Sequence, residues 1–415
     1  MKKRAFLREL CYASVLVLLL GSAVSCKRSV QSADPKTAVP ESDVATNATA
    51  AASQTHTYSV LFNGGSEGYH SYRIPSIVRT NAGTLLAFAE GRMDNPKDYG
   101  NINLVYKRST NNGTSWSALG EVVGVGPGTW GNPTAVVDRN TGRVWLFMSW
   151  NDGTHNQGGT DGYEPIDSWG ERRVYMTWSD DDGVSWAPQV DMTNTLLPPG
   201  YTWDGMGPGV GLQTSEAHAG RLIIPASRRN IYSDDHGVTW HYAMTPDGSG
   251  EATIIEQIGG TLMRNDRPGT AQFNTAKRRW ISTGTIEGGF GAWYPDNTLL
   301  DPKCEGSILR YTGVPSRIMF LNPGSTERRC KMRVRISYDE GATWPISRRT
   351  HDWLTDDETC DQGKGGYSSM CKTADYCVGA LIEINEDVAN SATSHKSIEF
   401  HKFNLPWILN GATEP

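Results

Sequence analysis

Apolar, β-prone runs recur along this chain, and several of them end directly in a cluster of polar, turn-forming residues. Arg173–Trp178 (RVYMTW) and Met332–Ile336 (MRVRI) are two such runs. Short runs rich in β-branched and aromatic residues, bounded by turn residues, are typical of strands that continue into hairpins. The pattern therefore predicts an all-β chain of many short strands joined by tight turns.

The polar cluster after the strand is nearly the same in four places. It contains Ser, then an acidic or amide residue, Gly, a hydroxyl residue and Trp. The short acid or amide can fold back onto turn amides, Gly takes a positive φ, and Trp covers the turn against the sheet. The four copies are Ser109–Trp116 (STNNGTSW), Ser179–Trp186 (SDDDGVSW), Ser233–Trp240 (SDDHGVTW) and Ser337–Trp344 (SYDEGATW).

These acidic, glycine-containing segments also have to be compared with EF-hand calcium loops. Such a loop needs an acid at its first position, ahead of the invariant Gly. That position holds Arg108, Trp178, Tyr232 and Ile336 in the four copies. We therefore interpret the copies as structural turns.

The spacing of the turns indicates how many sheets the chain forms. The stretch between Ser233 and Ser337 is about twice as long as that between Ser179 and Ser233. A four-stranded propeller blade needs roughly 40–50 residues. The long stretch is therefore expected to hold an extra blade with a degenerate box, near Arg279–Gly284 and Trp293. The four boxes resemble the Asp-boxes (BNR repeats) of sialidase-type propellers, and the prediction is a six-bladed β-propeller over residues 57–411.

Composition and charge limit the class of partner. The chain has 415 residues, with 45 Gly, 14 Trp and 16 Tyr, which suits many short strands and turns. Its net charge of -6 and pI near 5.9 provide no basic surface for nucleic acid. An anionic substrate would have to be bound by local arginines.

The N-terminal residues have the pattern of an export signal. Lys2–Arg4 are basic, Leu10–Leu20 are apolar, and small residues follow. Residues 1–25 are therefore a predicted signal peptide. Ala23–Cys26 resembles a bacterial lipobox with Ala in place of the usual Leu, which predicts a lipid on Cys26 as the only membrane contact; ordinary cleavage after Ser25 is the alternative. Residues 26–56 read as a flexible tether, so the expected location is the periplasm or cell envelope.

Five cysteines remain after residue 26. Because the number is odd, at least one is unpaired in an oxidising compartment. Cys360, Cys371 and Cys377 lie close together in sequence and are plausible partners for a local bridge. Neither the cysteines nor the nine histidines have zinc-site spacing, and the prediction includes no metal or cofactor.

A second set of motifs strengthens the family resemblance. Three segments precede the first box, in the order Tyr72–Pro75 (YRIP), Ala89–Asp94 and Lys97–Gly100. In this order, with four boxes, the chain strongly resembles bacterial retaining exo-α-sialidases (neuraminidases). Trp203–Gln213 and Cys304–Ser307 continue the similarity. The resemblance implies hydrolysis of terminal α-linked sialic acids from glycoproteins, glycolipids and oligosaccharides.

A sialoside carries a permanent carboxylate on its reacting carbon. Guanidinium groups bind a carboxylate through bidentate, charge-assisted hydrogen bonds. The family uses three arginines for this purpose, and the resemblance implies Arg73, Arg267 and Arg329. Arg264 and Arg328 are the alternatives for the second and third positions.

The same carboxylate disfavours an anionic nucleophile, because two anions would meet in a dry pocket. Sialidases use Tyr instead, and Tyr367 stands where the family places it. A phenol of pKa near 10 needs a base beside it. Glu251 is the predicted partner, and Glu256 is the alternative.

A proton donor for the leaving oxygen is the third requirement. The family places an Asp in the loop before the first box, which implies Asp98, with Asp94 as the alternative. Arg92 in the same segment is expected to bind the sugar's C4 edge. Rival functions are a trans-sialidase, a hydrolase of a related nonulosonic acid, and a non-catalytic sialic-acid-binding propeller.

Overall fold

The computed structural model describes residues 53–124, 126–270, 275–385 and 395–415. The described residues all belong to one compact unit, Pro40–Pro415. The predicted signal peptide 1–25, Cys26 and most of the tether lie outside the described residues. No described helix has the length and apolar character needed to cross a membrane.

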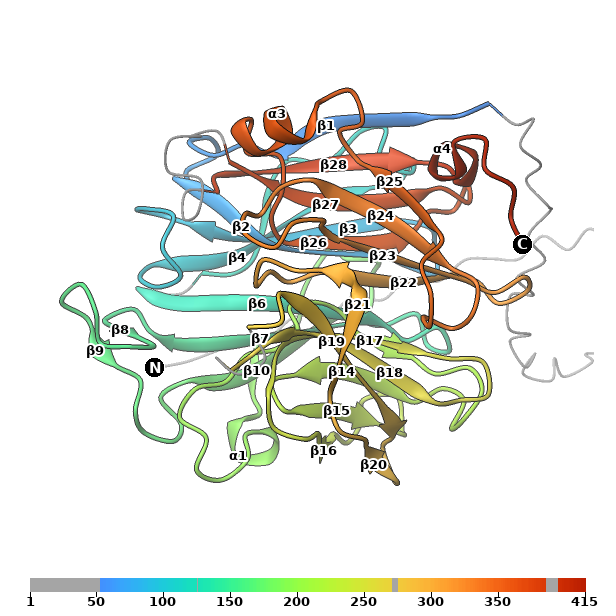
Figure 1. The fold of residues 1–415 in the computed structure, drawn as a ribbon. Helices are drawn as coiled ribbons and strands as arrows, with labels where there is room; N and C mark the ends of the chain where they lie inside the picture. The colour runs from blue at the N-terminus through green and yellow to red at the C-terminus, as the bar shows by residue number, and fades with distance from the viewer. Residues whose placement is uncertain (1–52, 125, 271–274, 386–394) are drawn as a thin grey trace, which may run out of the picture. The chain divides into compact units, whose positions relative to one another are not determined.

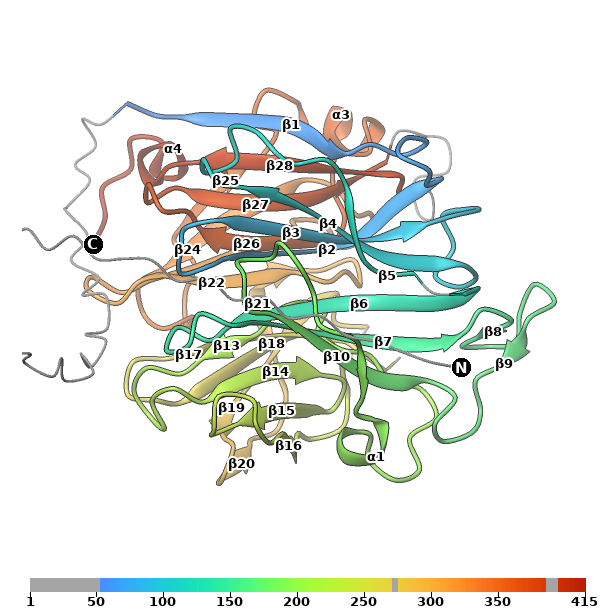
Figure 2. The ribbon, with the colours of Figure 1, turned by 180° about the vertical axis from the view of Figure 1, so that it is seen from behind.

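Mainly antiparallel sheets of short strands make up the described part of the unit Pro40–Pro415 (Figures 1 and 2). Three described sheets have four strands and one has five. Their strands are β1 (His56–Phe62), β26 (Ser368–Lys372), β27 (Val378–Ile384) and β28 (Ser397–Phe403); β13 (Leu212–Gln213), β14 (Leu222–Ala226), β15 (Arg229–Ser233) and β16 (His241–Met244); β17 (Ser249–Glu256), β18 (Leu262–Pro268), β19 (Arg278–Thr285), β20 (Gly289–Phe290) and β21 (Tyr294–Leu300); and β22 (Ser307–Thr312), β23 (Arg317–Pro323), β24 (Met332–Ser337) and β25 (Ile346–Arg349).

The other large sheet has nine strands. They are β2 (Ser71–Arg79), β3 (Leu85–Arg92), β4 (Ile102–Ser109), β5 (Gly120–Val123), β6 (Gly128–Val137), β7 (Val144–Asp152), β10 (Arg173–Ser179), β11 (Val190–Asp191) and β12 (Gly209–Val210). A small pair, β8 (His155–Asn156) and β9 (Glu164–Pro165), and the helices α1 (Thr193–Leu196), α3 (Asp356–Asp361) and α4 (Leu405–Leu409) lie in the connections.

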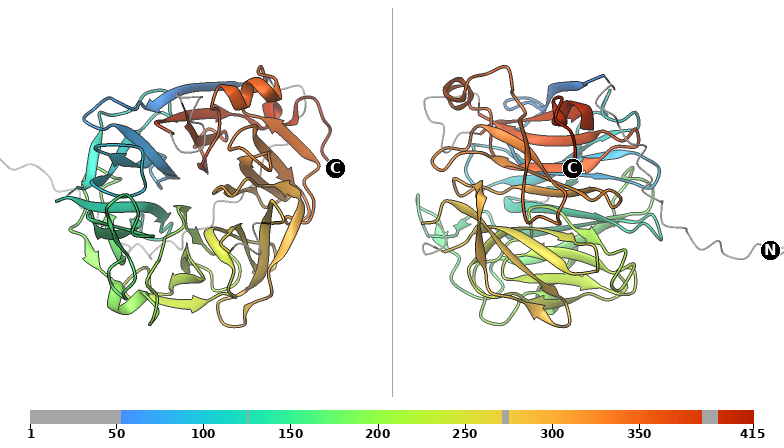
Figure 3. Two further views of the ribbon diagram at one scale, coloured as in Figure 1. Left: turned by 60° about the vertical axis from the view of Figure 1, so that its left-hand side comes forward. Right: turned by 45° about the vertical axis from the view of Figure 1, so that its right-hand side comes forward.

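The sheets follow one another around an axis, which Figure 3 (left) views end-on. One inner strand contacts the next in the order β2, β6, β14, β17, β22 and β26, and β26 contacts β2 again. β1 completes the circle because it pairs with β28, with His56 opposite Phe403. The sheet β1-β28-β27-β26 therefore combines both ends of the described chain, and the fold is an all-β, propeller-like ring.

The sheets do not separate into the six blades that the sequence predicts. Hydrogen bonding gives four separate blades of four or five strands, together with the nine-stranded sheet, in the described part of the chain. The strands β2–β5 merge with the strands β6, β7, β10 and β11 because β4 and β6 share one parallel pair, Ile102 opposite Thr129. The stretch between the third and fourth boxes does contain a sheet, β17–β21, with β19 at the degenerate box.

The four boxes fold as turns that dock against the preceding sheet. In each, the Ser hydroxyl accepts a hydrogen bond from the Gly amide, at 2.7–2.9 Å. The box glycines have φ between 76° and 90°, and a Cβ on Gly113 would lie 2.2 Å from Phe400. Trp116 packs edge-on against the same Phe400, with centroids 5.0 Å apart. The repeated residues thus close a hairpin and also join neighbouring sheets.

The described disulfide links Cys330 to Cys360, so the expectation of a local bridge among Cys360, Cys371 and Cys377 is wrong. Cys371 lies buried on β26 and Cys377 lies across the following turn, and both are free thiols. Cys360 instead sits on α3, which packs beside the loop that carries Cys330. Sequence proximity failed here because a strand and its turn direct neighbouring side chains apart.

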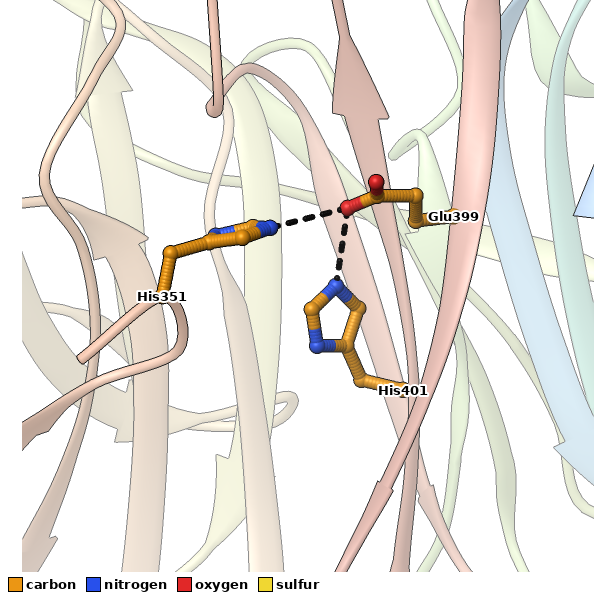
Figure 4. Close-up of side chains that lie close together, drawn as sticks. All are labelled: His351, Glu399 and His401. Carbon is orange, nitrogen blue, oxygen red and sulfur yellow. Dashed lines mark hydrogen bonds and ion pairs between the residues drawn. The ribbon is translucent and has the colours of Figure 1, made fainter. Parts of the chain in front are cut away.

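A buried polar cluster lies where β1 pairs with β28 and the circle of sheets is completed; its central residues are shown in Figure 4. Nε2 of His351 and Nε2 of His401 lie 2.9 and 3.1 Å from the same oxygen of Glu399. Lys364 Nζ lies 2.6 Å from the other oxygen, and His56 Nε2 lies 3.0 Å from His401 Nδ1. The donor set resembles a metal site, but Lys364 already neutralises Glu399, so the cluster is complete as a hydrogen-bond network joining β1, β28 and the segment after β25.

This cluster predicts a loss of stability in mild acid. Burial lowers the pKa of His401 from 6.5 to about 4. The unfolded chain therefore binds a proton that the folded chain excludes, and stability present above pH 6.5 falls as the pH drops towards 4. We expect the free energy of unfolding to decrease by about 2 kcal/mol from this residue between about pH 7 and pH 5. Urea denaturation of the wild type and of His401→Gln measures it.

The variant should lose less stability over this pH range than the wild type. His241→Gln, at an exposed position on β16, is the matched control. Parallel pH profiles for the wild type and His401→Gln would contradict the prediction.

Candidate active site

One pocket of about 1190 Å³ is lined by all seven residues nominated from the sequence, which come from widely separated elements. They are Arg73 on β2, Arg92 at the end of β3, Asp98 in the loop before β4, Glu251 on β17, Arg267 on β18, Arg329 in the loop before β24, and Tyr367 directly before β26. They converge because the inner strands of successive sheets surround one axis (Figure 3).

Three guanidinium groups surround the ring of Tyr367. The central carbons of Arg73, Arg267 and Arg329 lie 5.7, 6.0 and 5.0 Å from the ring centroid. Cations at this distance are attracted to an aromatic face but repel one another. Their placement therefore requires anionic partners. Arg73 pairs with Glu383 and Arg267 pairs with Glu251.

Glu383 on β27 is the buried partner of Arg73. Its carboxylate accepts hydrogen bonds from Arg73 Nε at 2.8 Å and Arg73 Nη2 at 3.3 Å. The same carboxylate accepts bonds from the backbone amides of Ile74, at 2.8 Å, and Tyr367, at 3.0 Å. Burial opposes its ionisation, but the charge of Arg73 prevails and lowers the pKa of Glu383 to about 2. One side chain thus fixes an arginine and the backbone of the central tyrosine.

The sequence reasoning did not identify Glu383. A signal was present, because Glu383 is the one charged residue in the run Val378–Ile384 (VGALIEI). All seven residues of that strand are buried. A lone carboxylate in such a strand requires a buried cation or several amide donors. Which cation it meets depends on the neighbouring sheet, so the sequence could indicate the need but not the partner.

Glu251 and Arg267 contact the hydroxyl of Tyr367. The phenol donates a hydrogen bond to Glu251 Oε1, and Arg267 Nη1 bonds both the phenol oxygen and Glu251 Oε2. Burial raises the pKa of Tyr367 well above its ordinary value, and the charge of Glu251 adds to this, while Arg267 and Arg329 act in the opposite direction. The phenol is therefore neutral at pH 7 and lies beside a carboxylate that can receive its proton.

Asp98 lies in the loop between β3 and β4. Its carboxylate lies 2.8 Å from Arg92 Nη2 and 3.6 Å from Arg73 Nη1, although its side chain is 76 % exposed. Its partial enclosure favours the neutral acid, but the charges of Arg92 and Arg73 outweigh this and hold the pKa of Asp98 below its usual range. Asp98 is an anion in the ligand-free pocket.

Arg92 and a further arginine, Arg172, form part of the pocket wall. Arg92 is fully buried and is paired with Glu90 at 2.6 Å. Arg172 is held by Asp204 O at 2.8 Å and by Asn132 Oδ1 at 2.9 Å. Arg172 is a second residue that the sequence reasoning missed, since its position before β10 carries no motif.

The four alternative residues lie elsewhere. Arg264 is fully buried and paired with Asp266 at 2.6 Å. Arg328 lies 3.5 Å from Asp361 and lines a smaller neighbouring pocket of about 290 Å³. Glu256 accepts the amides of Ser215, Glu216 and Ala217, and Asp94 is exposed. None of the four is among the residues that line the larger pocket.

The arrangement permits a defined kind of chemistry. Three guanidinium groups beside one another are suited to hold an anionic group of a ligand. A neutral phenol with a carboxylate at its hydroxyl has the parts of an activated nucleophile. A second carboxyl group, 3.6 Å from one of the three guanidinium groups, is placed to exchange a proton with a ligand. The pocket therefore suits substitution at a carbon that carries a carboxylate.

The chain is similar to known proteins over most of its length. The model of the BNR repeat-like domain matches residues 83–380. A protein of Arthroderma benhamiae called exo-alpha-sialidase is 49% identical over 367 residues, which cover 83% of this chain and 86% of that protein. A protein of Aspergillus fumigatus with the same name is 46% identical, with the same two coverages. The relatives are thus fungal as well as bacterial, since a sialidase of Micromonospora viridifaciens is 28% identical.

Solved structures agree in fold. A Hadza microbial sialidase superposes with a TM-score of 0.69 at 24% identity and covers 85% of this chain and 69% of its own. A leech intramolecular trans-sialidase gives a TM-score of 0.71 at 18% identity and covers 85% and 71%. At these identities the similarity bears on the fold alone.

The buried carboxylate predicts a stability effect. Glu383→Gln keeps the shape of the side chain but leaves Arg73 without its buried counter-charge. Breaking a buried ion pair from one side typically costs about 3–5 kcal/mol, because the remaining charge is uncompensated. We expect a decrease of this order in the free energy of unfolding, measured by urea denaturation.

The control is Glu327→Gln, whose 74 % exposed side chain lies 4.0 Å from Lys277. Exposed pairs of this kind contribute about 1 kcal/mol or less. Equal effects of the two substitutions would show that Glu383 carries no special electrostatic role.

Proposed function

This chain belongs to the sialidase family of glycoside hydrolases with BNR repeats, and from this premise we propose that it is a retaining exo-α-sialidase that uses a covalent sialyl-tyrosine intermediate. Its substrates would be terminal α-linked sialic acids on glycoproteins, glycolipids and oligosaccharides. The observation that carries the proposal is the contact of the Tyr367 hydroxyl with Glu251, inside the group formed by Arg73, Arg267 and Arg329.

Binding comes first in the proposed reaction. The carboxylate on the anomeric carbon of the sugar pairs with the three guanidinium groups. Arg329 is the most available of the three, because its side chain donates to an uncharged group, the backbone carbonyl of Lys303, at 3.2 Å. Arg73 and Arg267 each keep a carboxylate partner, Glu383 and Glu251, which holds them in place before the ligand arrives.

Bond exchange follows. Glu251 accepts the phenol proton while the Tyr367 oxygen forms a bond to the anomeric carbon. The bond from that carbon to the leaving oxygen breaks, and Asp98 gives that oxygen a proton. Water then attacks the anomeric carbon from the side that the leaving group has left, and Asp98 accepts its proton. The tyrosine oxygen departs and recovers its proton from Glu251, so the configuration is retained.

Substrate binding also explains how Asp98 could act as an acid. The positive charges of Arg92 and Arg73 keep it ionised in the free pocket. A substrate carboxylate beside Arg73 would neutralise part of that charge and bring a second anion close to Asp98. Both effects raise the pKa of a carboxyl group. The substrate itself would thus promote the protonated form that the leaving oxygen requires.

We also propose that the nine-stranded sheet represents two blades, which would give six in the ring. Strands β2–β5 and strands β6, β7, β10 and β11 each repeat the antiparallel order of the other sheets, and the two groups are connected by the pair Ile102 and Thr129. The six inner strands that contact one another in a circle support this count.

The first test removes the nucleophile. Tyr367→Phe should lower kcat/KM for a fluorogenic sialoside by at least about 10³-fold, because no oxygen remains to form the intermediate. Mass spectrometry after treatment with a 3-fluorosialyl fluoride should locate the covalent label on Tyr367. Tyr232→Phe, on β15 outside the pocket, is the control and should keep full activity. A label on another residue would overturn the assignment.

The second test concerns the acid. Asp98→Asn should lower kcat/KM for 3'-sialyllactose by about 10²–10⁴-fold, since its sugar alkoxide leaves only with a proton. A 4-nitrophenyl sialoside, whose leaving group needs little protonation, should lose far less. Asp94→Asn, at the exposed position, should affect neither substrate. Equal losses on both substrates for Asp98→Asn would exclude the acid role.

A further inference from the structure

The loop that carries Asp98 needs restraint from outside the pocket. The Asp98 side chain is 76 % exposed, and the segment 93–101 between β3 and β4 contains no strand or helix. Within the pocket the carboxylate is tied to Arg92 and Arg73. A substrate carboxylate that binds Arg73 would weaken the contact between Arg73 and Asp98. This would happen just before Asp98 has to reach the leaving oxygen.

The residues on both sides of Asp98 are attached to a single carboxylate. Lys97 Nζ lies 2.7 Å from Asp161 Oδ2, and the Tyr99 hydroxyl donates to the same oxygen. The Lys97 ammonium also lies 5.4 Å from the centre of the Tyr99 ring. The ring of Tyr163 meets Tyr99 edge-on at 4.6 Å. The two residues that flank Asp98, Lys97 and Tyr99, are therefore both attached to Asp161 Oδ2.

The anchor segment 152–165 has a dense internal framework of hydrogen bonds. Asn156, 4% exposed, accepts the amides of Gly158 and Thr160, both at 3.1 Å, and donates to Thr160 O at 2.8 Å. β8 pairs with β9 across the base of the segment. An anchor braced in this way can restrain a loop that has no regular structure of its own.

Asp161 also has a local role that must be separated from this one. Asp161 and Gly162 have φ of 58° and 83°, and Asp-Gly is a favoured pair for a turn with two positive φ values. Asn tolerates the same backbone conformation. Asp161→Asn therefore preserves the turn and removes the charge that attracts Lys97.

We propose that Asp161 is a positioning residue, which holds the Asp98 loop against the segment 152–165 so that Asp98 reaches the leaving oxygen. The proposal rests on the proposed acid role of Asp98. Lys97 and Tyr99 line the pocket, whereas Asp161 is not among its lining residues. Its substitution thus tests the attachment of the loop without changing a group that faces the substrate.

The expected effect is moderate and selective. The side chains of Lys97 and Asp161 are 47 % and 52 % exposed, and exposed pairs of this kind contribute little energy. A misplaced proton donor should slow the release of a poor leaving group more than that of a good one. For Asp161→Asn we expect kcat/KM to fall about fivefold to tenfold with 3'-sialyllactose and less than about twofold with 4-nitrophenyl sialoside.

The matched control is Asp180→Asn. Asp180 pairs with Arg143 at 2.6 Å, with a side chain 58 % exposed, outside the pocket. Both substrates should be turned over normally by this variant. A loss that is equal on the two substrates, or no loss at all, in Asp161→Asn would overturn the positioning role.

The comparison with Asp98→Asn separates the acid role of Asp98 from the positioning role of Asp161. If Asp98→Asn discriminates between the substrates and Asp161→Asn does not, the acid role survives and the positioning role fails. If Asp98→Asn shows no discrimination, the acid role fails and the inference fails with it. Lys97→Met combined with Asp161→Asn should be no worse than Asp161→Asn alone in the ratio of the two substrates, because the charge that attracts Lys97 is already gone.

Discussion

The arrangement of the pocket depends on how three guanidinium groups are kept around one phenol. Arg73, Arg267 and Arg329 would repel one another at these positions around one ring. The buried carboxylate of Glu383 compensates the charge of Arg73 and also accepts a hydrogen bond from the backbone amide of Tyr367. The carboxylate of Glu251 compensates the charge of Arg267 and also contacts the Tyr367 hydroxyl. Each carboxylate therefore positions a cation and the tyrosine together, and Arg329 is left as the most available site for an incoming anion.

The propeller-like ring and the pocket are built by different parts of the same repeat. The boxes lie at outer turns, where a glycine such as Gly113 and a tryptophan such as Trp116 press against the preceding sheet. The seven nominated pocket residues lie on the strands β2, β3, β17 and β18 or in the loops before β4, β24 and β26. The box turns and the pocket loops are therefore separate parts of the chain, and Asp98 and Asp161 both lie in segments between strands.

The sequence predicted local structure better than it predicted contacts between distant segments. The boxes predicted the hairpins, because a turn is determined by a few consecutive residues. Arg73, Glu251 and Tyr367 could be nominated through family motifs, and the structure brings them to one pocket. Glu383, Arg172 and Asp161 carry no motif, since their importance comes from partners in other segments. The partner of Cys360 was misjudged for the same reason: strand β26 turns Cys371 into the core, whereas Cys330 approaches from another loop.

By itself the sequence determined the type of architecture, the family and the kinds of side chain available for the chemistry. These properties depend on short-range periodicity and on turns, which neighbouring residues specify. Tertiary structure alone decided which arginines share a pocket, which carboxylates hold them, and where the boundaries between sheets fall. Those outcomes depend on a single pair such as Ile102 and Thr129, or on a buried contact such as that of Glu383 with Arg73. Electrostatic and hydrogen-bonding energies vary steeply with distance, and only the closed ring sets those distances.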